Sequence, residues 1–243
     1  MIKNSGWEQY EAIKTAELFK ENKTYDLVDL GANQALFTVQ LLKLINTSED
    51  TKISISNVML YEADSRLIPL MDKNLRSNLS SEININIQNI AISLKKGEVE
   101  LILEKENTAN NTLEPSAMAN ATSDEIRVKI KSINAIEFEE ATSKYCPNPL
   151  IYKSDIQGTD VPFFLSLSDN MISKIEIIII EFWPYVLKSN SVKIPTFIDR
   201  LKTFNEFFIY NSKGSLVSEN IDDLNTLCLT NSSTDYFNII GRR

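Results

Sequence analysis

The 243-residue chain has no histidine, only six glycines and only two cysteines. Without histidine, the chain cannot form a Ser-His-Asp triad, a Cys-His dyad or a His-ligated zinc site. Acid–base chemistry must therefore come from carboxylates, lysines, tyrosines or a carboxylate-bound metal. Because glycine is scarce, we expect each glycine at a position whose backbone conformation other residues tolerate poorly.

Basic runs and long apolar segments are also missing. The chain has 25 basic and 33 acidic residues, a net charge of −8, which disfavours a nucleic-acid partner. The most apolar stretch, residues 175–187, is interrupted by charges and is shorter than the roughly 20 residues of a membrane span. The first residues contain no apolar run, so we expect no secretory signal there, and the cysteines have no CxxC spacing. We expect a cytoplasmic protein with reduced thiols, whose oligomeric state stays open.

Apolar patterns predict strands alternating with helices. Strands are expected over residues 25–30, 58–61, 83–87, 150–152, 175–180, 207–210 and 236–240, and helices over 7–21, 36–45, 67–75 and 195–204. This alternation predicts one α/β domain with a mostly parallel seven-stranded sheet, an antiparallel C-terminal hairpin and an N-terminal helix (1–23) before the core (24–243). We also expect a β-hairpin turning at Gly97, with a polar loop over 107–124 after it.

Asp29 lies near the end of the first predicted strand, two residues before Gly31. Open α/β sheets bind ligands beyond the carboxyl ends of their strands, where Gly31 would allow a sharp turn. The segment does not match GxGxxG, so it suits a dinucleotide pyrophosphate poorly. Asp29 would suit a ligand carrying an ammonium group; alternatively, Asp29 or Asn33 caps the next helix.

The second predicted strand ends at Glu62. An acid at this position can accept two hydrogen bonds from a ribose diol, although a solvated acid is the alternative. Together, Gly31 and Glu62 predict a nucleoside cofactor without a pyrophosphate.

These residues resemble the FkbM family of S-adenosylmethionine-dependent methyltransferases, over roughly residues 25–184. Family motifs are matched in order by Asp29 with Gly31-Ala32-Asn33 and Thr38, by Glu62-Ala63, by Asn89 with Ile90 or Ala91, by Thr112-Leu113, and by Lys153-Ser154-Asp155-Ile156-Gln157-Gly158. A strand ending in Glu181 completes the order. The chain departs from the family where Ala35 replaces a glycine, Ala63 a proline and Gln157 a frequent glutamate.

The resemblance implies a Rossmann-like class I methyltransferase fold with S-adenosylmethionine as cofactor. The implied cofactor-binding residues are Asp29, Gly31, Ala32, Asn33, Thr38, Glu62, Ala63, Asn89, Ile90 and Asp155. It also implies O-methylation of a sugar, polysaccharide or secondary-metabolite hydroxyl, so the expected partner is a small-molecule or glycan acceptor.

Removing the hydroxyl proton requires a base. Asp155 is the first candidate, either as the base or as ligand to a divalent cation that acidifies the hydroxyl. Lys153 would hold Asp155 ionised, unless the two form only a structural ion pair. Glu181 is the second acid, with a capping or packing role as its alternative.

Two other functions stay open. Ala35 and Gln157 are compatible with a catalytically degenerate binding protein that keeps the methyltransferase fold. An NAD-dependent oxidoreductase is disfavoured by the missing GxGxxG.

Overall fold

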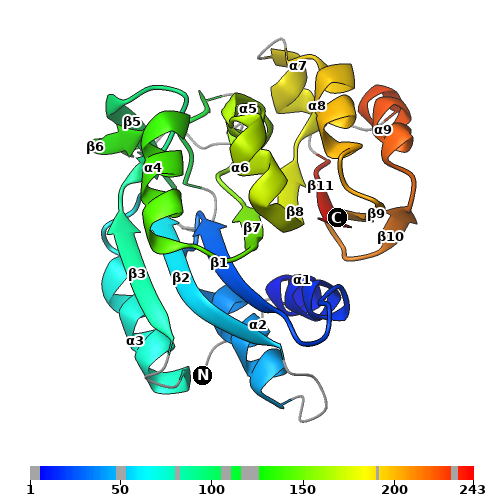
Figure 1. Ribbon diagram of the computed structural model, residues 1–243. Helices are drawn as coiled ribbons and strands as arrows, with labels where there is room; N and C mark the ends of the chain where they lie inside the picture. The colour runs from blue at the N-terminus through cyan, green and yellow to red at the C-terminus, as the bar shows by residue number, and fades with distance from the viewer. Residues whose placement is uncertain are drawn as a thin grey trace.

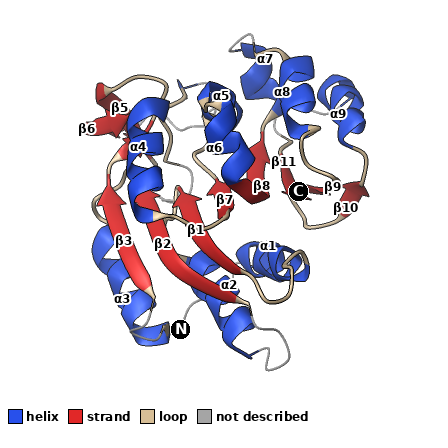
Figure 2. Ribbon diagram, in the orientation of Figure 1, coloured by secondary structure: helices blue, strands red, loops and turns tan. Residues whose placement is uncertain are grey.

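A central sheet of eight strands has helices on both faces (Figures 1 and 2). The computed structural model describes residues 6–47, 53–79, 83–104, 111–115, 126–189, 192–230 and 235–243. The sheet runs in the order β3 (Asn84–Asn89), β2 (Ser54–Glu62), β1 (Thr24–Leu30), β7 (Leu150–Ser154), β8 (Ile175–Phe182), β11 (Phe237–Arg242), β9 (Glu206–Asn211) and β10 (Leu216–Ser218). Strand β11 lies antiparallel between β8 and β9. This is the Rossmann-like methyltransferase fold, with the short strand β10 added at one edge.

The helices divide between the two faces of the sheet (Figure 1). One face carries α1 (Gly6–Glu17), α2 (Leu36–Thr47) and α3 (Ile68–Asn78); the other carries α4 (Ala135–Tyr145), α5 (Asp160–Ser166), α6 (Asp169–Lys174), α7 (Pro184–Ser189), α8 (Ile194–Leu201) and α9 (Leu224–Thr230), with a 3-10 turn at Ile221–Asp223. Strand β8 packs Ile178 and Ile180 into the second layer and Ile177 and Ile179 into the first. Burial on both faces explains why this strand is a continuous apolar run.

The predicted hairpin at Gly97 is wrong. A second sheet orders its strands β4 (Ala91–Ile92), β6 (Ile126–Ile133) and β5 (Gly97–Leu103), so β6 separates the two strands expected to pair. Strand β4 is parallel to β6, and β5 is antiparallel to it. Alternation within single strands does not specify which strands pair. Of the predicted loop over 107–124, only residues 111–115 lie within the described part.

The C-terminal strands pair antiparallel as predicted, but they do not form a simple hairpin. Strand β10 and helix α9 lie in the chain between β9 and β11. Strand β10 pairs with β9 and accounts for the eighth strand of the sheet, where seven were predicted.

Helix α1 buries polar as well as apolar side chains. Glu11, Ala12 and Thr15 are buried, whereas Ile13 is 37% exposed. Thr15 follows Ala12 by three residues and Glu11 by four, so the buried positions share one side of the helix. The inner side of α1 is therefore partly polar. It faces the hydrophobic cluster on the side of the sheet that also carries α2 and α3.

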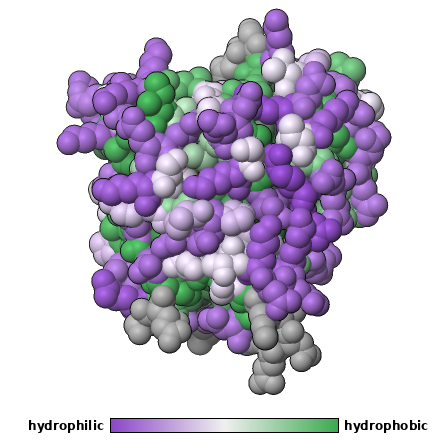
Figure 3. Space-filling view, in the orientation of Figure 1, coloured by the Kyte–Doolittle hydropathy of each residue, from purple (hydrophilic) through white to green (hydrophobic). Residues whose placement is uncertain are grey.

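The molecular surface seen in Figure 3 is mostly hydrophilic, with apolar side chains scattered across it. None of the helices in the described ranges combines the length and apolar character that crossing a membrane requires. Cys146 and Cys228 are both buried free thiols, as predicted.

Candidate active site

A row of buried polar side chains crosses the sheet at the edge where the parallel strands end and the antiparallel strand β11 begins. Asp29, Lys153, Glu181 and Asn238 are each more than nine-tenths buried. Asp29 is the register partner of Lys153, and Asn238 is the register partner of Glu181. Since side chains alternate along a strand, all four lie on the face that carries α1 and α2.

Lys153 is the cation of this row. Its Nζ lies 3.4 Å from Asp29 Oδ1 and 3.7 Å from Asp155 Oδ2. Burial opposes the charged form, but Asp29, Asp155 and Glu11 together raise the pKa of Lys153 above its ordinary value. Thr38 Oγ1 donates to Asp29 Oδ2 at 2.7 Å, while Asp29 Oδ1 makes no hydrogen bond. Lys153 thus stays charged and pairs with both acids.

Carboxylates outnumber this cation. Burial raises the pKa of Glu11 to about 8, although Lys153 opposes the shift. Burial, followed by the charges of Asp155 and Asp160, raises the pKa of Glu181 well above its ordinary value. Protons therefore neutralise part of the cluster in the absence of a ligand. A positively charged ligand would take over that role.

Gln157 joins two of the acids. Its Nε2 donates to Asp155 Oδ1 at 2.8 Å and lies 3.3 Å from Glu181 Oε2. The Asp155 side chain is 35% exposed, whereas Glu181 is 6% exposed. The residue that replaces a family glutamate is thus a neutral donor between two carboxyl groups.

Gly31 is required by the protein's own backbone. Its φ is +74°, and a Cβ there would lie 1.9 Å from the Asp155 carbonyl oxygen. Asp155 N also donates to Leu30 O at 3.0 Å, which holds the ends of β1 and β7 together. The close approach predicted for Gly31 is therefore made by the segment after β7.

The N–H groups of the turn after β1 are bonded within the protein. Gly31 N and Ala32 N both donate to Tyr61 O, at 2.9 and 3.0 Å. Asn33 N donates to Glu62 Oε2 at 2.8 Å. A pyrophosphate needs free backbone donors at such a turn, so this arrangement disfavours the NAD alternative.

Glu62 has the geometry expected of a ribose-binding acid. Its Oε1 accepts from Asp64 N at 2.7 Å, so backbone donors orient both carboxylate oxygens. Each oxygen keeps one acceptor site for a further hydroxyl. Burial raises the pKa of Glu62 to about 7, and the hydrogen bonds from Asp64 and Asn33 oppose this shift.

Asn89 hydrogen-bonds to the backbone at the end of β2, where Glu62 lies. Asn89 Nδ2 donates to Glu62 O at 2.9 Å and to Ala63 O at 3.2 Å. Ile90 packs against the hydrophobic cluster of the α4 layer. These predicted binding residues thus hold the end of β2 through their own contacts.

Ala35 adopts a left-handed conformation, with φ of +58°, at the start of α2. Its side chain is completely buried in the hydrophobic cluster under α1 and α2. The extra methyl group therefore packs in the core.

Four residues of the site were not predicted from the sequence. Asp64 pairs with Arg66 at 2.6 Å and accepts from Asn111 Nδ2 at 2.8 Å; its position two residues after Glu62 was a usable signal. Glu11 and Asn238 carry no such signal, because their burial depends on tertiary packing. Tyr236 stacks on Trp183, with ring centroids 5.6 Å apart.

The ring centroids of Trp183 and Tyr185 are 5.5 Å apart. Three aromatic rings therefore lie together just after β8, close to Glu181 near the end of that strand. Trp183 and Tyr185 are only partly buried, so part of each residue is accessible beside Glu181. Burial, followed by the charge of Glu181, raises the pKa of Tyr185 to about 12.

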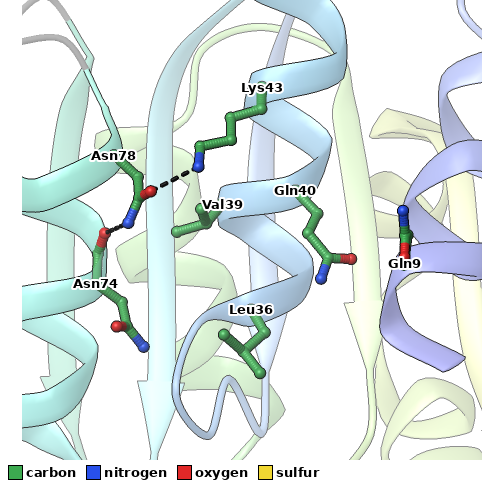
Figure 4. A pocket seen from close by; sticks show the side chains of 7 residues that line it. All are labelled: Gln9, Leu36, Val39, Gln40, Lys43, Asn74 and Asn78. Atoms are coloured by element: carbon green, nitrogen blue, oxygen red, sulfur yellow. Dashed lines mark hydrogen bonds between the residues drawn. The ribbon is translucent and has the colours of Figure 1, made fainter. Parts of the chain in front are cut away.

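Two other features lie apart from this site. No group of three or more Asp, Glu or Cys side chains in the described ranges could hold a metal ion, so the predicted divalent cation has no support. A cavity of about 260 Å³ runs along α2 between α1 and α3 (Figure 4). It is lined by Gln9, Leu36, Val39, Gln40, Lys43, Asn74 and Asn78. None of these residues belongs to the polar row.

Comparisons with known proteins give only distant likenesses. No family model and no curated protein matches the chain. Among solved structures, it is 8% identical to a precorrin-6y C5,15-methyltransferase from Geobacter metallireducens, covering 97% of this chain and 87% of that chain with a TM-score of 0.42. It is 8% identical to an rRNA methylase from Streptococcus thermophilus, covering 100% and 98% with a TM-score of 0.43.

A Streptococcus mutans protein in complex with SAH is 10% identical, covering 100% of both chains with a TM-score of 0.43. At these identities and scores, the likenesses identify neither a family nor a substrate.

Proposed function

We propose that the chain is an S-adenosylmethionine-dependent methyltransferase that methylates a hydroxyl group of a small-molecule or glycan acceptor. The observation that carries the proposal is the pairing of Glu62 with an acid-rich cluster at adjacent strand ends. Glu62, at the end of β2, offers two oriented oxygens, and Asp29, one strand away, belongs to the cluster.

The residues present fit this cofactor in their hydrogen-bonding groups and charge. Glu62 would accept the ribose hydroxyls. Asn33 Oδ1 is buried without a hydrogen-bond partner and lies next to the N–H that binds Glu62, so it offers a further acceptor. Asp29, Asp155 and Glu11 suit the ammonium and sulfonium charges, while Lys153 would pair with the carboxylate.

When bound, S-adenosylmethionine supplies an electrophilic methyl group. The protein's part is to align the acceptor and remove its proton. Glu181 would remove the proton, because it is the buried acid next to the aromatic rings at the end of β8. Gln157 Nε2 holds Glu181 Oε2, which leaves Oε1 to take the proton. Asp155, held by Lys153 and more exposed, would orient the acceptor.

The acceptor would enter beside the aromatic rings at the end of β8. Trp183 and Tyr236 are stacked and partly exposed, and such faces bind the apolar side of a sugar or another ring. This supports the acceptor class that the resemblance implied.

Calorimetry with S-adenosylmethionine tests the proposal. The wild-type protein should bind it, and Glu62→Ala should weaken binding by tenfold or more, since two hydroxyl hydrogen bonds are lost. Glu98→Ala, which removes an exposed acid of β5, is the matched control and should leave the affinity unchanged. No binding at millimolar cofactor would contradict the proposal.

A methyl-transfer assay with tritiated cofactor and a panel of hydroxylated acceptors tests the chemistry. Glu181→Gln should retain cofactor affinity and lower turnover by at least a hundredfold. Asp155→Asn, which removes a charge that the cofactor would meet, should weaken cofactor binding and slow transfer by a smaller factor than Glu181→Gln. Unchanged turnover in Glu181→Gln would remove that residue from the proton transfer.

A further inference from the structure

A short segment, residues 111–115, reaches the candidate active site from the second sheet. Thr112 pairs with Ile102 of β5 through two backbone hydrogen bonds of 2.9 and 3.1 Å. Asn111 donates to Asp64 at 2.8 Å, beside the predicted ribose acid. The segment thus joins β5 to the strand ends of the main sheet.

Thr112 makes the contact nearest the acid pair. Its side chain is 1% exposed, and its Oγ1 donates to the backbone carbonyl of Gln157 at 2.7 Å. Glu114 N donates back to the same Oγ1 at 2.9 Å, which fixes the rotamer of the hydroxyl. The bond from Thr112 is therefore well oriented before any ligand binds.

Gln157 needs such an anchor because its backbone is strained. Its φ is +53°, a left-handed conformation that costs a non-glycine residue about 1 kcal/mol or more. Asp160 fixes the residues on either side, since its carboxylate accepts from Ile156 N at 2.9 Å and from Gly158 N at 3.1 Å. Thr112 binds the carbonyl of the Gln157–Gly158 peptide, whose N–H is bound by Asp160.

We propose that Thr112 is a positioning residue: by holding the Gln157 backbone, it keeps the Gln157 amide between Asp155 and Glu181, the acids of the proposed methyl transfer. The catalytic part of this statement rests on the proposed function. The contact chain itself, from Thr112 through Gln157 to Glu181, does not depend on it.

The ionisation of Glu181 provides a readout that needs no acceptor. The groups facing it are Asp155 after β7, Asp160 at the start of α5, Tyr185 on α7 and Tyr236 before β11. Trp183 lies two residues away and is one of only two tryptophans, so Trp7→Phe makes its fluorescence specific. Losing a donor to the ionised carboxylate should move the Glu181 midpoint upward by about one pH unit.

The experiment is a fluorescence titration from pH 5 to 10 in the Trp7→Phe background. Glu181→Gln should abolish the transition, which assigns it. Thr112→Val should raise the midpoint by about one unit, and Thr112→Ser, which keeps the hydroxyl, should restore the original value. Far-UV circular dichroism checks that each variant is folded.

A double-variant cycle tests the route through Gln157. Gln157→Ala should raise the midpoint as Thr112→Val does, and combining the two should add nothing. An unmoved midpoint in Thr112→Val, an additive shift in the pair, or the absence of any Glu181-dependent transition would each overturn the proposal.

Asn111→Ala is the matched control on the same segment. It removes the contact with Asp64 and should leave the Glu181 midpoint in place. Calorimetry with S-adenosylmethionine on the same proteins separates the two claims. Failure of the wild type to bind contradicts the proposed function, whereas a midpoint that ignores Thr112 contradicts only the positioning role.

Discussion

Replacing Gly31 with alanine is expected to separate the two strand ends on which the site is built. The new Cβ would lie 1.9 Å from the Asp155 carbonyl oxygen and 2.8 Å from its carbonyl carbon. These are backbone atoms, so no side-chain rotation relieves the overlap. The Asp155 backbone must move, and the bond from Asp155 N to Leu30 O is lost or weakened.

The cost has two parts. The left-handed conformation of residue 31 costs alanine about 1–2 kcal/mol, and overpacking costs about 1–3 kcal/mol. A total near 3 kcal/mol corresponds to a fall in Tm of about 6–12 °C for a chain of this size. Displacing Asp155 should also weaken S-adenosylmethionine binding by tenfold or more.

Differential scanning calorimetry with and without cofactor measures both effects, and Gly97→Ala is the control. Gly97 also has a positive φ, +126°, but a Cβ there meets nothing within 4 Å. The control therefore carries backbone strain without the overlap. If both variants lost the same stability and bound cofactor equally well, the proposed tight contact between Gly31 and Asp155 would be refuted.

Three further substitutions test the polar row and its surroundings. Burial raises the pKa of Glu11 from 4.5 to about 8, so the folded state binds this proton more tightly than the unfolded state, and stability falls as pH rises between those values. This loss in the free energy of unfolding is on the order of 4 kcal/mol. Thermal melts at pH 5 and 9 should therefore show a larger fall in Tm for the wild type than for Glu11→Gln. Equal falls would contradict the burial of this carboxyl group. Asp29→Asn keeps a partner for Thr38 but removes the charge beside Lys153, so urea unfolding should show a loss of about 3 kcal/mol; a loss below 1 kcal/mol would mean that the ion pair is unimportant. Ala35→Gly relieves a positive φ but removes a buried methyl group, so stability should change by less than about 1 kcal/mol and cofactor affinity by less than twofold; a large gain in affinity would show that the methyl group obstructs the cofactor.

The sequence was most informative where a residue's role is set by its own strand. The β8 run is apolar because both faces of that strand are buried, and Asp29 and Glu181 stand out because they interrupt such runs. The positions of Gly31 and Glu62 at strand ends were predicted from the same patterns and are confirmed.

Contacts between distant segments were not predictable in the same way. Glu11 is a charged residue on a helix, and its burial follows only from how that helix packs in the tertiary fold. The partner of β5 is β6, which follows after more than twenty intervening residues, so the pattern around Gly97 could not identify it. Thr112 was matched to a motif, but its bond to Gln157 depends on the tertiary fold.

The most direct test of the central claim is a crystal structure with S-adenosylmethionine bound. The proposal predicts that the ribose hydroxyls bind Glu62, that the methionine end lies beside Asp29 and Lys153, and that the methyl group faces Glu181. A cofactor bound elsewhere, for instance in the cavity along α2, or a ribose with no contact to Glu62, would contradict it.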